Sequence, residues 1–124
     1  MLIDHIGIAV SNPSRSREFY SIALAPLGME LVAEEKDWVG FGKNGKAEFW
    51  FGPDTVVHPP MHIAFVSNSR LNVDRFYEAA LRAGASDNGM PGIRKKYHLN
   101  YYGAFVLDSD GHNIEAVCHL AQEA

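Results

Sequence analysis

The most unusual position in the sequence is Glu115, a carboxylate inside a stretch that otherwise has the pattern of a buried strand. Residues 108–111, Asp-Ser-Asp-Gly, are typical of a tight turn, because aspartate side chains bond the local backbone and Gly111 tolerates a positive φ. The apolar runs on either side, 102–107 and 113–118, predict the two strands of a β-hairpin. A buried carboxylate needs a cation, hydrogen-bond donors or a metal ion, so Glu115 is the first candidate for a functional residue.

Two histidines have the spacing to join Glu115. His5 and His62 each lie near the start of an apolar, β-branched run. When the chain is aligned on these histidines without gaps, three dipeptides agree: His5-Ile6 with His62-Ile63, Phe19-Tyr20 with Phe76-Tyr77, and Ala23-Leu24 with Ala80-Leu81. This agreement predicts an internal duplication. If the duplicated sheets curve into a common cleft, His5 and His62 face each other across it and Glu115 approaches both. Two imidazoles and a carboxylate are a known divalent-metal set with positions left for substrate.

The repeated unit has the pattern of a β-α-β-β-β module. The elements predicted for the first module are strand 3–10, helix 14–24 and strands 29–33, 38–42 and 47–51. Those predicted for the second module are strand 62–66, helix 71–83, a strand and loop within 85–100, and strands 102–107 and 113–118. Phe19, Ile22 and Ala23 form the apolar face of the first helix. Asn44-Gly45 predicts a tight hairpin turn.

These elements predict one α+β domain over residues 1–124. Module one occupies 1–52, a proline-containing linker occupies 53–60 and module two occupies 61–119. We expect the strands to form a cupped mixed sheet around a cleft, with the helices on the outside.

The duplication also suggests a fourth metal ligand. The counterpart of Glu115 in module one lies within 47–51, where Glu48 is the one residue able to bind a metal. Counting from the turn glycines Gly45 and Gly111 instead selects Phe49. Because a shift of one residue moves a side chain to the opposite face of the sheet, both assignments stay open.

Composition narrows the class of protein. The chain has 124 residues, 47% of them hydrophobic and 21% charged, as expected of a globular protein with its own core. Its net charge of −4 argues against nucleic acid or an anionic membrane as a partner. The single cysteine, Cys118, excludes an internal disulfide and fits a reducing compartment. With no apolar run of membrane-spanning length and no secretion signal at the N-terminus, we expect a cytoplasmic protein.

The combined motifs resemble the vicinal oxygen chelate superfamily, which holds glyoxalase I, extradiol dioxygenases, fosfomycin-resistance proteins and bleomycin-binding proteins. The residues that carry the resemblance are Asp4-His5-Ile6, Arg17-Glu18-Phe19-Tyr20, His62-Ile63-Ala64-Phe65 and the segment 108–115. The resemblance implies that His5, His62 and Glu115 fall on the family's metal positions, with Glu48 near the fourth. It also implies a divalent ion (Zn, Ni, Mn or Fe), a small substrate with adjacent oxygen atoms, and a homodimer that shares its sites between chains.

The sequence also departs from individual branches of that superfamily. Glyoxalase-like members usually carry a clear second glutamate on the fourth strand, where this chain has the aromatic run Phe49-Trp50-Phe51. Fosfomycin-resistance members usually have a threonine where this chain has Gly7. Extradiol dioxygenases share the two-histidine, one-glutamate set but are usually longer.

Further residues qualify as site candidates by their chemistry. His98 and Tyr101 are candidate acid/base or substrate-orienting groups, since imidazole titrates near neutrality. Candidate pocket residues are Phe49, Trp50, Arg94 and Tyr102. Each also has a structural interpretation: the aromatic residues as packing, and Arg94 as part of a solvated basic run at 94–96. Glu115 itself could pair with Arg94 in a cleft that has lost its metal.

Three hypotheses about function follow. The first is a divalent-metal-dependent lyase or isomerase, in which Glu48 or Glu115 moves a proton beside a carbonyl. The second is a non-haem Fe(II) extradiol-type dioxygenase that uses the two histidines and one carboxylate. The third is a metal-free protein that binds a small molecule, such as a drug or antibiotic, in its aromatic cleft.

Overall fold

The computed structural model describes residues 3–53 and 60–122. The first module contains β1 (Ile6–Ala9), α1 (Pro13–Ala23), the 3₁₀ helix η1 (Ala25–Leu27), β2 (Glu30–Glu35), β3 (Trp38–Lys43) and β4 (Lys46–Gly52). The second contains β5 (His62–Val66), α2 (Arg70–Arg82), β6 (Ser86–Ile93), β7 (Tyr102–Leu107) and β8 (Asn113–Cys118). Most of the predicted linker, residues 54–59, lies outside the described residues.

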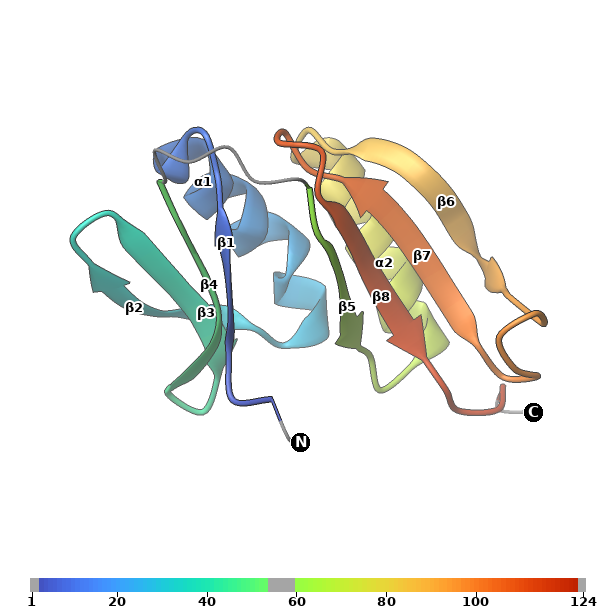
Figure 1. Cartoon of the computed structure of the whole chain (residues 1–124). Coiled ribbons are helices and arrows are strands. Elements are labelled where there is room, and N and C mark those ends of the chain that lie inside the picture. Colours follow the sequence, from blue (N-terminus) through green and yellow to red (C-terminus); the bar gives the residue numbers. More distant parts are fainter. Residues whose placement is uncertain (1–2, 54–59, 123–124) are drawn as a thin grey trace.

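Each module forms one four-stranded mixed sheet, and the two sheets have the same topology (Figure 1). The strand orders are β1-β4-β3-β2 and β5-β8-β7-β6, in which β1 and β5 run parallel to their neighbours and the other pairs are antiparallel. The predicted α+β fold with a duplicated β-α-β-β-β unit is therefore confirmed. The strands form two sheets rather than one, because β1 and β5 lie next to each other without a hydrogen-bonded ladder between them.

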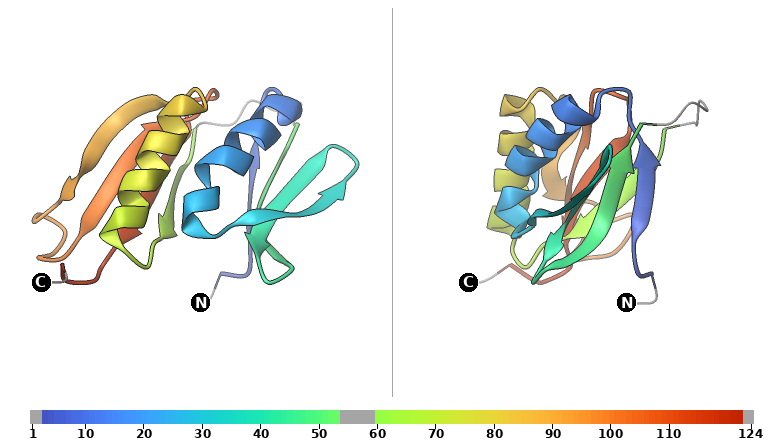
Figure 2. Two further views of the ribbon diagram at one scale, coloured as in Figure 1. Left: turned by 180° about the vertical axis from the view of Figure 1, so that it is seen from behind. Right: turned by 90° about the vertical axis from the view of Figure 1, so that its left-hand side faces the viewer.

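Both helices lie against the same side of the two sheets (Figure 2). Helix α1 begins at Pro13, and the side chain of its N-cap residue Asn12 accepts from the Arg15 N–H. Phe19, Tyr20 and Ala23 are buried on this helix, whereas Ile22 is 43% exposed. The predicted apolar face was therefore wrong at Ile22. The helix turns Tyr20 to the core instead, where the Tyr20 hydroxyl donates to Asp108 Oδ2 at 2.6 Å.

The turn at 108–112 joins the two modules at one end of β1 and β5. His112 is buried, and its Nδ1 accepts from the Met61 N–H at 2.9 Å while its Nε2 donates to the Ala9 carbonyl, also at 2.9 Å. Asp110 Oδ1 accepts from the Ser11 N–H at 3.0 Å. Because these bonds connect the end of β1 to the start of β5, the two strands are antiparallel to each other. We call these contacts the 108–112 latch.

Candidate functional site

Glu115 lies on β8 and is 1% exposed, so its carboxylate depends on the groups around it. His62 Nε2 donates to Glu115 Oε1 at 2.9 Å, and the Tyr101 hydroxyl makes a short hydrogen bond to Oε2. Gly103 makes room for this arrangement, since a Cβ there would lie 3.3 Å from Oε2 and 3.2 Å from the Tyr101 ring. The carboxylate is therefore satisfied by one imidazole and one phenol.

Tyr101 keeps its proton in this setting. Burial, together with the hydrogen bond to Glu115 and its negative charge, raises the Tyr101 pKa far above its usual range. Tyr101 is thus a permanent donor at neutral pH that fixes the orientation of Glu115. The sequence predicted a common site for His62 and Glu115 and named Tyr101 only as a candidate acid/base or substrate-orienting group; the structure brings all three side chains together.

His5 lies just before β1, and its side chain is 58% exposed. Its Nδ1 bonds Asp4 Oδ1 at 2.7 Å, and the other oxygen of Asp4 accepts from Lys46 Nζ, also at 2.7 Å. The charge of Lys46 and these hydrogen bonds lower the pKa of Asp4. Metal-bound histidines commonly place one nitrogen on the ion and the other on a carboxylate, so this arrangement leaves His5 Nε2 available as a ligand. The sequence interpretation assigned no such role to Asp4, although a carboxylate directly before a candidate ligand is a usable signal.

The two histidines do not face each other within one chain. His5 lies beside Phe65 and Val66, at the end of β5, whereas His62 starts that strand. Four residues of extended chain span about 13 Å, too far for one ion to bind both rings. Within 3–53 and 60–122, no three His, Cys, Asp or Glu side chains gather closely enough to hold a metal. The predicted convergence is therefore wrong for a single chain, because the 108–112 latch sets β1 and β5 antiparallel.

The fourth ligand position is occupied by a different residue from the one predicted by symmetry. In the parallel pairs, Gly7 lies opposite Trp50 and Ala64 lies opposite Glu115. Since His5 corresponds to His62, Gly7 corresponds to Ala64, and the counterpart of Glu115 is therefore Trp50. The count from the turn glycines fails by one residue because β3 pairs Gly42 with Ala47 and Phe41 with Phe49, which leaves Glu48 as the extra residue of a β-bulge.

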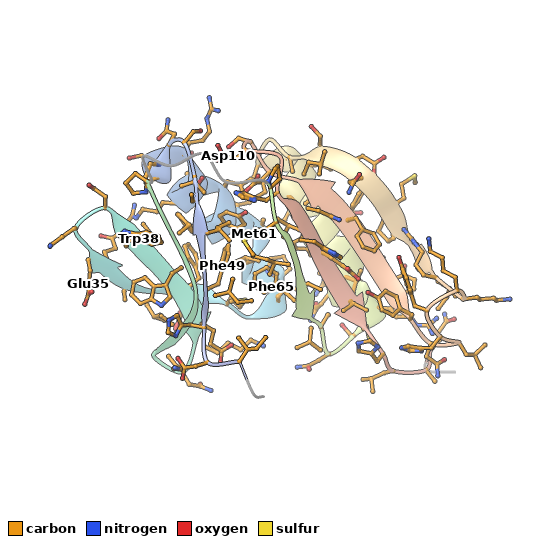
Figure 3. The ribbon with its side chains drawn as sticks, viewed as in Figure 1. Glu35, Trp38, Phe49, Met61, Phe65 and Asp110 are labelled. Atoms are coloured by element: carbon orange, nitrogen blue, oxygen red, sulfur yellow. The ribbon has the colours of Figure 1, made fainter. Side chains whose placement is uncertain are left out.

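A cavity of about 250 Å³ lies where β1 and β5 separate, at the end opposite the 108–112 latch. Asp4, His5, Lys43 and Glu48 are its polar wall residues, and its apolar wall includes Phe49 and Phe65. The Phe49 and Phe65 rings meet edge to face between the two sheets, with centroids 5.3 Å apart (Figure 3). Phe49 is 2% exposed, so it contributes to the core more than to a substrate surface.

Three other candidates lie apart from the Glu115 carboxylate. His98 Nε2 and His119 Nδ1 share a hydrogen bond of 2.7 Å at the surface, and both rings contact the ring of Tyr101. Arg94 does not pair with Glu115, because its guanidinium donates to the carbonyls of Gly92 and Met90 and lies over Phe105. Tyr102 was expected in the pocket, but it faces α2, where its hydroxyl donates to Asp74.

The donor chemistry of these groups fits a divalent ion. Two neighbouring ligand atoms about 2.1 Å from one ion are about 3 Å apart in octahedral geometry. His62 Nε2 and Glu115 Oε1 are 2.9 Å apart through a hydrogen bond, so an ion that replaced the shared proton would find an imidazole nitrogen and a carboxylate oxygen side by side. His5 supplies a third ligand of the right type from elsewhere in the chain. The residues therefore fit a metal as two partial sites rather than as one complete site.

Comparison with known proteins identifies the family. The model of the Glyoxalase/Bleomycin resistance protein/Dioxygenase superfamily matches residues 2–116. The chain belongs to this superfamily, as its motifs predicted. The sequence matches no curated protein.

Solved structures with the same fold are distant in sequence. A glyoxalase/bleomycin resistance protein from Albidiferax ferrireducens is 22% identical, with a TM-score of 0.84, and the match covers 95% of this chain and 99% of that one. A glyoxalase/bleomycin resistance protein/dioxygenase family enzyme from Burkholderia phytofirmans is 17% identical, with a TM-score of 0.74, and the match covers 95% and 98%. A V278E mutant of glyoxalase I from Zea mays is 20% identical, with a TM-score of 0.71, and the match covers 93% of this chain and 45% of that one.

Proposed function

We propose that this chain is a divalent-metal-dependent lyase or isomerase that acts on a small substrate with two adjacent oxygen atoms. The ion would be held by His5 of one chain together with His62 and Glu115 of a second copy, so the active form would be a homodimer. One observation carries this proposal: His5, hydrogen-bonded to Asp4, and the hydrogen-bonded His62–Glu115 pair lie at opposite ends of neighbouring strands. A second copy can bring the two partial sites together, which one chain does not.

The residues of the chain have separate roles in this proposal. A divalent ion bound there would supply Lewis-acid polarisation of the substrate oxygens. Tyr101 holds the Glu115 carboxylate in one orientation, and Asp4 holds His5 with Nε2 available. Glu48 is exposed in the wall of the cavity that also contains His5, so it is the carboxylate available to move a proton beside a carbonyl.

The position of Trp50 favours a second candidate, a non-haem Fe(II) dioxygenase. Trp50 occupies the position in module one that is equivalent to Glu115 in module two, so the duplication does not provide a second carboxylate there. The proposed ligand set is then two histidines and one carboxylate. That set with open positions is the one used by many Fe(II) oxygenases. Iron in the purified protein and oxygen uptake with a catechol would favour this candidate over the lyase or isomerase.

A complementation experiment tests the shared site. His5→Ala and His62→Ala chains are purified separately, mixed, unfolded and refolded together, and their metal content is measured. Each variant alone is expected to bind no stoichiometric metal. In a mixed dimer, one site loses both histidines and the other keeps both. Because random pairing makes about half of the dimers mixed, and each of these has one intact site out of two, about a quarter of the wild-type metal is expected to return.

The control is Glu78→Ala, which removes an exposed carboxylate on α2 outside the proposed ligand set and is expected to keep full metal content. No recovery in the refolded mixture would contradict a site shared between chains. Equal and negligible metal in wild type and His62→Ala would favour the metal-free binding protein.

Among the described residues, no helix has the length and apolarity to cross a membrane. A cytoplasmic location remains part of the proposal, supported by the single buried Cys118.

A further inference from the structure

The two tryptophans of the chain lie together on the open face of the first sheet. Phe49 and Phe51 of β4 contact the Tyr20 ring of α1, so Trp50 between them points to the opposite side. Trp38 is on the neighbouring strand β3, and Figure 3 shows it over the first sheet. Trp38 is 37% exposed, and Trp50 is partly exposed. We call the exposed surface of these two indoles the tryptophan platform.

Glycines allow both indoles to lie flat on the sheet. A Cβ on Gly52 would lie 2.4, 2.6 and 2.8 Å from three atoms of the Trp38 five-membered ring. A Cβ on Gly40 would lie 3.0 and 3.1 Å from two atoms of the Trp50 six-membered ring. Similar distances to several ring atoms mean that the missing Cβ would meet the face of each ring, not its edge. Each indole therefore covers a glycine with one face and can offer the other to a ligand.

The tryptophan platform adjoins the proposed metal position. Trp50 is the counterpart of Glu115 and lies opposite Gly7, which is two residues after His5. A molecule whose oxygens lie near His5 would extend over the Trp50 ring. The exposed carboxylates of Glu35 and Asp37 flank Trp38, and Glu48 lies close to Trp50 in the sequence. Exposed Lys36 lies between Glu35 and Asp37, but the three carboxylates outnumber it, so the border is net acidic and disfavours an anionic ring.

We propose that the tryptophan platform binds the uncharged, planar aromatic part of the substrate by stacking. This inference rests on the proposed function for the end of the substrate that carries the adjacent oxygens, and it adds that the remainder of the substrate is an aromatic ring. Trp50 and Trp38 then select substrates by stacking on their aromatic ring. His5, His62 and Glu115 do not contact that ring.

The test measures binding of 2,3-dihydroxynaphthalene, which has a planar ring and two adjacent oxygens, to the dimer by calorimetry. Trans-1,2-cyclohexanediol, which keeps the adjacent oxygens but lacks the aromatic ring, is the comparison ligand. We expect naphthalenediol to bind at least about tenfold more tightly than the aliphatic diol, and Trp50→Leu and Trp38→Leu each to remove about tenfold of its affinity. Since Trp38 and Trp50 are the two tryptophans of the chain, naphthalenediol is also expected to quench the intrinsic tryptophan fluorescence.

A pair of glycine variants separates stacking from general damage to the sheet. Gly52→Ala places a Cβ 2.4 Å from the Trp38 ring, which forces that ring from its place, and is expected to weaken naphthalenediol binding. Gly7→Ala places a Cβ at an ordinary 3.7 Å from Trp38 and is expected to leave binding unchanged. Thermal unfolding of both variants checks that they fold.

Metal content, measured in the same samples, keeps this proposal separate from the proposed function. Full metal content with unaltered naphthalenediol affinity in Trp50→Leu would overturn the stacking proposal alone. Failure of acrylamide to quench the fluorescence of the dimer would also overturn it, because the platform would then be covered by the second chain. We expect His62→Ala to lose the metal and to keep ring stacking. A wild-type protein that stacks the ring but holds no metal would contradict the proposed function alone.

Discussion

At the scale of single residues, the site depends on which hydrogen-bond donors meet a carboxylate that is buried away from water. Glu115 has no arginine or lysine partner among the described contacts and relies on His62 and Tyr101. The sequence identified Glu115 as anomalous because a carboxylate interrupts an apolar strand. The sequence did not identify Tyr101 as the hydrogen-bond donor to Glu115, because the loop before β7 carries several aromatic residues with no periodicity.

Tyr101→Phe tests the role of the phenol. We expect it to destabilise the fold by about 1–3 kcal/mol, since a buried carboxylate loses a donor. We also expect metal affinity to fall about 10–100-fold if Tyr101 orients a ligand. Chemical denaturation and a metal-competition titration measure the two effects. Tyr97→Phe, which removes an exposed hydroxyl from the ring that neighbours Tyr101, is the control and is expected to change neither value.

At the scale of elements, periodicity predicted both helices and most strands of the described residues to within a few residues, while β6 was predicted only as a strand somewhere within 85–100. The hairpin strands 102–107 and 113–118 were predicted with their observed bounds. The pairing register was harder to predict from the sequence. One extra residue in a strand leaves the strand recognisable by its apolar residues but shifts every later residue to a different partner on the neighbouring strand. Glu48 is that residue, and Gly42 accommodates the bulge, since a Cβ there would lie 1.7 Å from the Lys46 carbonyl oxygen.

The contact between α2 and β7 gives the protein a stability change at alkaline pH. The Tyr102 hydroxyl donates to Asp74 at 2.6 Å, and burial together with that carboxylate raises the pKa of Tyr102 to about 12. The neutral phenol is favoured in the fold, so its contribution is complete below pH 10 and is lost as the pH rises toward 12. The free energy of unfolding, measured by urea denaturation, is expected to fall less steeply over this interval in Tyr102→Phe than in wild type. Parallel slopes in the two proteins would contradict this role.

At the scale of the whole molecule, the relative placement of the modules decides what one chain can do. Turn composition revealed the hairpin at 108–112, but no local pattern indicates that its side chains bind β1 and the residue before β5. In the sequence, Asp110 and His112 belong to a turn and its flank, and neither was a candidate functional residue. In the fold they fix the direction of β1 against β5 and thereby separate His5 from His62.

His112→Ala tests the latch. The substitution leaves the Met61 N–H and the Ala9 carbonyl without their partner, so we expect a loss of at least about 2 kcal/mol in the free energy of unfolding. Chemical denaturation measures the loss. His119→Ala, an exposed histidine, is the matched control and is expected to stay near the wild-type value. A His112→Ala chain as stable as that control would show that other contacts hold the modules together.

The equivalence of Trp50 and Glu115 has an evolutionary consequence. Under the proposed function, one amino-acid substitution at this position would take a lineage between three and four metal-binding side chains. The same step trades a stacking surface for a charged group. Ligand preference and reaction chemistry would then be linked at a single position, so that chains with nearly the same backbone could diverge in both at once.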